Sequence, residues 1–217
     1  MRFPLVSGLG CHDVTVTTAA TPKGERRRQA LVEAAAELIL EGGIEAVRHR
    51  AVATRAGLPL ASTTYYFDSL EQLVVCAMQH NGARDVEIMR ARVEDVPASP
   101  RSPETTAELV LDLLVGNAES DDDRDRLVAR HEGCVATVRH PELREAQVSL
   151  REQIDDLLTD LLERCGREVR VPQLHRLVVV VDGAVLCGLV DVDPDPRAAA
   201  RAILVDVMHT VAPPAEP

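Results

Sequence analysis

The chain has 217 residues, of which 46% are hydrophobic and 27% charged, and its formal net charge at pH 7 is -11. This composition is ordinary for a folded globular protein and excludes a disordered chain. With only two tyrosines, two phenylalanines and no tryptophan, the chain must build its core from aliphatic side chains.

The acidity is concentrated in the C-terminal part of the chain. Residues 1–92 carry 11 basic and 10 acidic side chains, whereas residues 93–217 carry 13 and 25. Affinity for DNA depends on neutralising phosphates with basic side chains. The acidity therefore argues against DNA binding by residues 93–217 but not by residues 1–92. Within residues 22–55, seven basic side chains outnumber five acidic ones, and this local excess permits a DNA-binding surface.

Residues 1–22 show no helical period and predict a flexible arm. Pro4 and two glycines interrupt their short apolar stretch, which makes a poor signal peptide. The longest apolar run, residues 177–190, contains Asp182 and is shorter than the ~20 residues that cross a bilayer. The five cysteines are scattered without a CxxC pair, which favours reduced thiols. We therefore expect a cytoplasmic protein that does not bind membranes.

A clear helical period begins after Glu25. Leu31, Ala34, Ala35, Leu38 and Ile39 recur on one face, with glutamates on the other, and two glycines at 42 and 43 end the segment. This spacing predicts an amphipathic helix of about 17 residues.

Two short helices follow, over residues 49–56 and 60–67. Gly57 separates them at a position that suits a positive φ, and Pro59 suits the start of the second helix. Asp68 and Ser69 then give an N-cap signal for a long helix that starts at Leu70. Two short helices joined at a glycine predict a helix-turn-helix unit, in which the second helix reads the major groove of DNA.

The C-terminal part predicts five further helices. Three prolines between 97 and 103 mark a loop, and the acidic residues 120–123 predict a turn. In one segment, the four valines 178–181 suit a strand, but the segment's length and the lack of another strand candidate favour a buried helix. We expect an all-α fold of about nine helices, with helical segments at residues 106–118, 125–140, 141–166, 173–190 and 196–211.

The stretch GIEAVRHRAVATRAGLPLASTTYYFDSLEQLV, residues 43–74, resembles the DNA-binding domain of TetR-family transcriptional repressors. The likeness rests on VAxxAG at 52–57, on the aromatic end of the second short helix, and on FxSxExL at 67–73. It implies a helix-turn-helix domain at residues 23–69 and a helical effector-binding and dimerisation domain at 70–217. It also implies a dimer that binds a palindromic operator.

The candidate DNA contacts lie on the two short helices and at their borders. Small residues at 61–64 let a helix seat deeply in the groove, and tyrosine hydroxyls can reach phosphates. We expect one of the two tyrosines to point inward and the other outward, and Phe67 to belong to the core. The predicted DNA-binding residues are Arg27, Arg48, His49, Arg50, Ala61, Ser62, Thr63, Thr64, Tyr65, Tyr66 and Ser69.

Two positions depart from the common pattern of the family. Leu70 stands where a lysine often follows the serine, and Arg48 stands where the first short helix often has a Thr or Ser cap. Lys23 and Arg26 to Arg28 offer a compensating basic arm along the DNA backbone or in its minor groove, or else only a solvated helix start.

The effector pocket is expected near one face of the segment 125–140. His131 falls on the face formed by Leu127, Cys134, Val135 and Val138, where it is either a satisfied core histidine or a polar anchor for a ligand. The predicted pocket residues are His131, Cys134, Val135, Val138 and His175. The spacing of His131 and Cys134 does not favour a metal site completed by His175 or Cys165. We predict no metal and no cofactor.

No aromatic residue lies between 68 and 217, so an aliphatic effector is expected rather than an aromatic one. The homodimer is expected to form through residues 173–190 and 196–211. The leading hypothesis is a dimeric repressor that a small molecule releases from its operator. The alternatives are a small-molecule-binding module with weak or no DNA binding, or a small cytoplasmic enzyme, which the lack of catalytic motifs disfavours.

Overall fold

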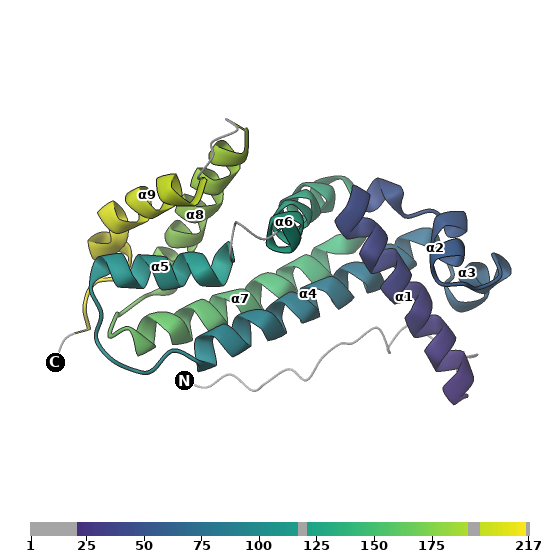
Figure 1. Ribbon diagram of the computed structural model, residues 1–217, viewed down its shortest axis with the longest axis horizontal. Helices are drawn as coiled ribbons and strands as arrows, with labels where there is room; N and C mark the ends of the chain where they lie inside the picture. The colour runs from purple at the N-terminus through teal and green to yellow at the C-terminus, as the bar shows by residue number, and fades with distance from the viewer. Residues whose placement is uncertain (1–20, 117–120, 191–195, 216–217) are drawn as a thin grey trace. The chain divides into compact units, whose positions relative to one another are not determined.

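The computed structural model describes residues 21–116, 121–190 and 196–215. These ranges contain nine α-helices, two 3-10 helices and an isolated β-bridge between Arg167 and Pro214, with no strand (Figure 1). The expected all-α class is confirmed, whereas the predicted arm lies almost wholly outside the described residues. The helices are α1 (Pro22–Gly42), α2 (His49–Arg55), α3 (Ala61–Tyr66), α4 (Leu70–Glu94), α5 (Pro103–Leu114), α6 (Asp121–Arg139), α7 (Arg144–Arg164), α8 (Val171–Val190) and α9 (Pro196–Val211), with 3-10 helices at Ile44–Ala46 and Pro141–Leu143.

The chain divides into two compact units. The first runs to Asn81 and takes in Val135–Ala146, and the second comprises Gly82–Cys134 and Gln147–Pro217. The first unit therefore contains the predicted domain 23–69 together with the first turns of α4.

The core of the first unit forms where the helical period predicts it. Leu31, Ala35 and Ile39 of α1 are buried, and they belong to one cluster with Phe67 and Leu73. The Thr21 hydroxyl oxygen caps α1 by accepting a hydrogen bond from the Gly24 amide at 3.1 Å, and the helix ends at Gly43, where φ is 67°. Local caps and one apolar face thus place α1.

The second unit is built from helices packed on one another around leucines. The last helix, α9, packs against α8, which precedes it in the chain, and against the sequence-distant α5 (Figure 1). Leu111, Leu158, Leu177 and Leu204 are fully buried in this core. The four valines lie in the helix α8, as expected, but only Val178 and Val181 are buried, and Val179 is exposed. The predicted acidic turn at 120–123 is wrong from Asp121 onward, where α6 begins.

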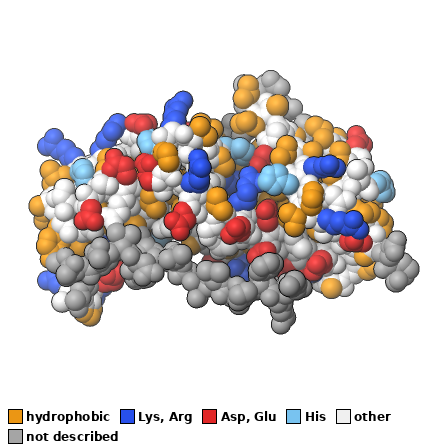
Figure 2. All heavy atoms as spheres, turned by 180° about the vertical axis from the view of Figure 1, so that it is seen from behind, with side chains coloured by type: hydrophobic (Ala, Val, Ile, Leu, Met, Phe, Trp, Pro, Cys, Tyr) orange, Lys and Arg blue, Asp and Glu red, His pale blue; other side chains and the backbone are white. Residues whose placement is uncertain are grey.

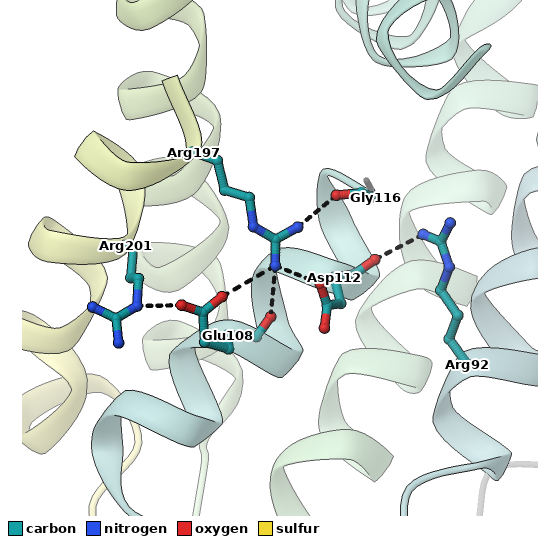
Figure 3. Close-up of polar contacts among 6 residues, drawn as sticks. All are labelled: Arg92, Glu108, Asp112, Gly116, Arg197 and Arg201. Atoms are coloured by element: carbon teal, nitrogen blue, oxygen red, sulfur yellow. Dashed lines mark hydrogen bonds and ion pairs between the residues drawn. The ribbon is translucent and has the colours of Figure 1, made fainter. Parts of the chain in front are cut away.

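An ion-pair cluster joins α9 to α5. The Arg197 guanidinium contacts the Asp112 carboxylate, lies 3.1 Å from Glu108 Oε2, and donates to the Gly116 carbonyl at 2.6 Å. Arg201 contacts the other oxygen of Glu108 (Figure 3). The same end of α5 is held from α4, where Arg92 donates to the Asp112 carbonyl at 2.7 Å (Figure 3). The last turn of α5 is therefore fixed by polar contacts as well as by its core leucines.

Among the described residues, α8 contains one window, Val171–Gly188, that is long and apolar enough to cross a membrane by length and composition alone. Helices in the interior of proteins pass the same criterion.

Candidate functional site

Helices α2 and α3 form the helix-turn-helix, and the turn between them depends on one glycine. Gly57 has a φ of 64°, a value that side-chain-bearing residues rarely adopt. The Leu58 amide then donates to the Ala53 carbonyl at 2.9 Å, which closes the turn against α2. The end of α2 and the start of α3 are thereby held close together.

A hydrogen-bond chain locks the two helices from inside. The Thr63 hydroxyl donates to the Leu60 carbonyl at 2.8 Å, and the His49 Nδ1 atom lies 2.9 Å from the same hydroxyl oxygen. Because a hydroxyl has a single hydrogen, the imidazole must be the donor of the second bond. Thr63 has 0% exposure, so its predicted role as a base contact is corrected to a structural one.

The outward face of α3 is small and polar. Ala61, Thr64 and Tyr65 are exposed and Ser62 is half-buried. The aromatic residues divide as expected, since Tyr65 is 58% exposed, Tyr66 packs against the core, and Phe67 is 2% exposed. The two tyrosine rings meet edge to face, with centroids 4.9 Å apart. Tyr65 is therefore the tyrosine whose hydroxyl can extend outward from the domain surface.

The arginines of α2 and its N-terminus differ in their surroundings. Arg50 is exposed. Arg48 is also exposed but pairs with Glu45 at 3.2 Å. Arg55, at the other end of α2, is held by Glu41 and Glu37 of α1 at 2.7 and 3.1 Å, and hydrogen bonding to Arg55 lowers the pKa of Glu41. Of these arginines, Arg50 has the surroundings that best suit a DNA contact.

The start of α4 is capped by its own side chains. The Ser69 hydroxyl oxygen accepts from the Gln72 amide at 3.1 Å, and the Gln72 side chain accepts from the Asp68 amide at 2.8 Å. Hydrogen bonds from the Glu71 amide and the Ser69 hydroxyl also lower the pKa of Glu71. A phosphate at this helix start would thus meet the positive end of the helix dipole and also the negative charge of Glu71.

The basic cluster of α1 does not act as one unit. Lys23, Arg26 and Arg27 are exposed, but Arg28 is buried, with its guanidinium carbon 5.1 Å from the centroid of the Phe67 ring. The proposed basic arm therefore loses Arg28, which instead stabilises the core by a cation–π contact. The helical position of Arg28, three residues before Leu31 on the apolar face, is the sequence signal that could have revealed this.

Three hollows of the second unit surround the end of α5. The largest has a volume of about 310 Å³ and is lined by α4, α5 and Leu161 of α7. Two smaller hollows of about 40 Å³ each flank Leu114 and Arg130, one beside α4 and the other between α6, α7 and α8. We call the last of these the α6–α8 pocket. It is lined by Leu114, Arg130, His131, Cys134, Gln147, Leu150, Arg151, Ile154, Asp155, Val178 and Asp182.

Arg130 and His131 carry the polar chemistry of this pocket. Arg130 donates to the Leu114 carbonyl at 2.6 Å and lies 3.8 Å from Asp182. Burial lowers the pKa of Arg130, an effect opposed by the charges of Asp182 and Asp85. The His131 Nδ1 atom lies 2.8 Å from the Leu127 carbonyl oxygen, while its Nε2 atom is buried without a hydrogen-bond partner.

The other predicted pocket residues behave differently. Cys134 lines the pocket as a free thiol and accepts a hydrogen bond from Gln147 at 3.2 Å. Val135 and Val138 are exposed, Val138 by 81%, and His175 is exposed on α8, so these three are corrected to residues outside the pocket.

Of the predicted α6 face, His131 and Cys134 line the pocket, whereas Val135 and Val138 are turned away from it. Leu127 and Gly133 of this helix are buried, and Arg130 lies between them with its guanidinium bonded to the end of α5. The long apolar stem of arginine permits this inward orientation.

Exposed apolar residues form a stripe along α8. The space-filling view shows orange side chains gathered over the part of the second unit that carries α8 and α9 (Figure 2). A Cβ atom added at Gly183 would meet no atom within 4 Å, so nothing in the described chain requires a glycine there. The stripe repeats at helical spacing and consists of Pro172, Val179, Gly183, Leu186 and Val190, with the exposed Arg176 as its one charged residue.

The glycine-centred turn, the small outward face of α3, and the separate helical unit define a helix-turn-helix transcriptional regulator. A model of the family described as "Tetracyclin repressor-like, C-terminal domain" matches residues 101–210, and a model described as "Bacterial regulatory proteins, tetR family" matches residues 31–75. The chain belongs to the TetR family of bacterial regulatory proteins.

Individual relatives agree with this assignment. The chain is 26% identical to the HTH-type transcriptional regulator PksA of Bacillus subtilis, over 77% of this chain and 80% of that protein. It is 32% identical to the HTH-type transcriptional repressor KstR of Rhodococcus jostii, over 48% of this chain and 51% of that protein. Among solved structures, the multidrug binding protein EbrR complexed with proflavin is similar, with 29% identity, a TM-score of 0.63, and coverage of 83% of this chain and 98% of that one.

Proposed function

We propose that the protein is a cytoplasmic homodimeric repressor, not an enzyme, which binds a palindromic operator and leaves it when a small aliphatic effector binds. The observation that carries the proposal is the outward face of α3. Ala61, Thr64 and Tyr65 are exposed there, while the Thr63–His49 hydrogen bond fixes α3 against α2. A rigid helix with small exposed residues can enter the major groove of DNA.

The proposed DNA contacts differ in kind. The Tyr65 hydroxyl and the helix start at Ser69 and Leu70 are suited to phosphates, whereas the methyl group of Thr64 can touch a thymine. Arg50 supplies a positive charge beside α3, and Arg27 supplies another on α1. Arg48 contributes less because Glu45 already pairs with it. Ser62 and Tyr66 are half-buried and support the exposed residues beside them.

The proposed dimer interface is the apolar stripe of α8 together with the exposed side of α9. Val179, Leu186 and Val190 expose large apolar surfaces, which a second copy would bury. Gly183 lies in the middle of the stripe and would allow two helices to approach closely. A two-fold axis through this surface would present two α3 helices to the two halves of a palindrome.

The proposed effector site is formed by the hollows around the end of α5. Leu114 and Arg130 border both smaller hollows, and Gly116 borders the largest. EbrR is complexed with proflavin in its structure, but this chain has no aromatic residue between 68 and 217 to stack on such a ring. Aliphatic residues dominate the apolar lining, which supports an aliphatic effector.

The ion-pair cluster supplies a route from the effector site to the dimer interface. Arg197 of α9 holds the Gly116 carbonyl and the Asp112 carboxylate at the end of α5, and these groups border the largest hollow (Figure 3). A ligand that displaces this end of α5 would therefore shift α9. A shift of α9 at a dimer interface would change the distance between the two α3 helices.

The proposal is tested by selecting DNA fragments from a random library with the purified full-length protein. A selected palindrome whose half-sites are about one helical turn apart would support it. Recovery of no sequence, with binding to all DNA equally weak, would favour a small-molecule-binding module instead.

A further inference from the structure

The hydrogen positions on His131 follow from its neighbours. A carbonyl oxygen only accepts hydrogen bonds, so the Nδ1 atom, 2.8 Å from the Leu127 carbonyl oxygen, carries the hydrogen. In the neutral ring, Nε2 is then an acceptor with an unshared electron pair. This atom is buried and has no hydrogen-bond partner in the described chain. The nearest acidic oxygen, Oδ1 of Asp182, lies 3.8 Å away, beyond hydrogen-bonding distance.

The formal charges that line the α6–α8 pocket cancel. Arg130 and Arg151 bring two positive charges, and Asp155 and Asp182 bring two negative ones. A carboxylate ligand would be attracted by both arginines but repelled by both aspartates, and an ammonium ligand the reverse, so neither gains a net attraction. The lining therefore favours a ligand without net charge, because an added charge would enter a half-buried site that is already balanced.

The remaining lining sets the shape of the ligand. Leu114, Leu150, Ile154 and Val178 are aliphatic, and the cavity volume is about 40 Å³. About 10–15 Å³ of such space holds one water molecule, so the pocket has room for a polar group of that size and for more than this group alone. A hydroxyl group has that size, and it can both donate a hydrogen bond and accept one.

We infer that the effector is a neutral aliphatic alcohol whose hydroxyl group donates a hydrogen bond to His131 Nε2 and lies beside the Arg130 guanidinium, with its hydrocarbon part along Leu150, Ile154 and Val178. This inference rests on the proposed function, since it names the ligand class of the proposed effector site. His131 is the residue that distinguishes the hydroxyl group from an oxygen that cannot donate.

The experiment compares four ligands of equal chain length on the full-length protein by calorimetry at pH 8, where an ordinary histidine is neutral. The probes are 1-hexanol, its methyl ether, hexanoate and hexylamine. We expect hexanol to bind about tenfold more tightly than each of the others, because the ether cannot satisfy the buried acceptor and the ions add an unbalanced charge. Binding of hexylamine, hexanoate or the ether as tight as that of hexanol would overturn the inference.

Two variants locate the selectivity. His131→Phe keeps a ring but removes the acceptor. We expect this variant to lower the preference for hexanol over the ether about tenfold. His140→Phe, which changes a half-exposed histidine outside the pocket, should keep the wild-type preference. An unchanged preference in His131→Phe would contradict the assignment.

DNA binding of the same preparations separates the two proposals. A protein that binds its selected DNA but shows no preference for hexanol would refute the hydroxyl inference and leave the regulator intact. A protein that prefers hexanol but selects no DNA would refute the regulator and retain the pocket chemistry.

Discussion

The imidazole of His49 donates a hydrogen bond to the Thr63 hydroxyl oxygen over 2.9 Å, and the hydrogen of that hydroxyl is committed to the Leu60 carbonyl. One buried threonine thus joins the first residue of α2 to the middle of α3. The angle between the two helices, on which DNA reading depends, therefore rests partly on this pair.

Replacing this threonine should loosen the helix-turn-helix. Thr63→Val keeps the shape but leaves the His49 N–H and the Leu60 carbonyl without this partner, which should cost about 1–3 kcal/mol of unfolding free energy. Chemical denaturation monitored by circular dichroism would measure the loss. Thr63→Ser keeps the hydroxyl and should lose less. Equal stability of the valine variant and the wild type would show that the hydrogen bonds contribute nothing.

Removing the exposed groups near α3 should weaken DNA binding without unfolding the protein. Arg50→Ala is expected to lower the slope of log affinity against log salt by about one, and Tyr65→Phe to lower affinity through loss of one phosphate contact. Fluorescence anisotropy with the selected operator would measure both. Arg90→Ala, an exposed arginine of α4 in the second unit, is the control. Loss of affinity in the control equal to that in Arg50→Ala would remove the assignment.

The dimer should depend on the apolar stripe of α8. Val179→Glu places a charge on the stripe and should shift the protein toward a monomer in analytical ultracentrifugation, with helix content retained. Val138→Glu makes the same change at an exposed valine of α6 and should leave the assembly unchanged. A Val179→Glu protein that sediments as the wild type would place the interface elsewhere.

The α5–α9 cluster should stabilise the second unit. Arg197 contacts the carboxylates of Asp112 and Glu108 and the carbonyls of Gly116 and Glu108, and Arg197→Ala would remove these contacts at a partly buried site while Arg201 still pairs with Glu108. A loss of about 1–3 kcal/mol in unfolding free energy is expected. Arg170→Ala is the matched control, because Arg170 forms an exposed ion pair with Glu168 at 3.5 Å, and such pairs contribute little.

Acid should weaken the link between α1 and α2. The hydrogen bond from Arg55 lowers the pKa of Glu41 in the folded protein, so this contribution to stability is fully present above the ordinary glutamate pKa of about 4.3. It is lost as the pH falls through the lowered pKa. Thermal unfolding of Glu41→Gln should differ from that of the wild type at neutral pH and converge with it in acid. Glu33→Gln, on the same helix, should show no such convergence.

The sequence by itself determined the elements that depend on local rules. The spacing of apolar residues placed α1, and the glycine at 57 and the capping serine at 69 placed α2, α3 and the start of α4. These signals depend on residues within one or two helical turns of each other, so they can be recognised without knowledge of the fold. The division of roles between Tyr65 and Tyr66 was also expected, since adjacent helical residues point in directions about 100° apart.

Only the tertiary structure decided which side of certain helices is buried. Arg28 was expected in a basic arm or a solvated helix start, but it is buried against the Phe67 ring. Arg130, which the sequence did not single out, donates to the distant Leu114 carbonyl. Thr63 was read as a groove contact, but His49 draws it inward. The physical reason is common to all three, because a polar side chain can be buried when a partner satisfies it, and that partner is set by contacts between helices far apart in the sequence.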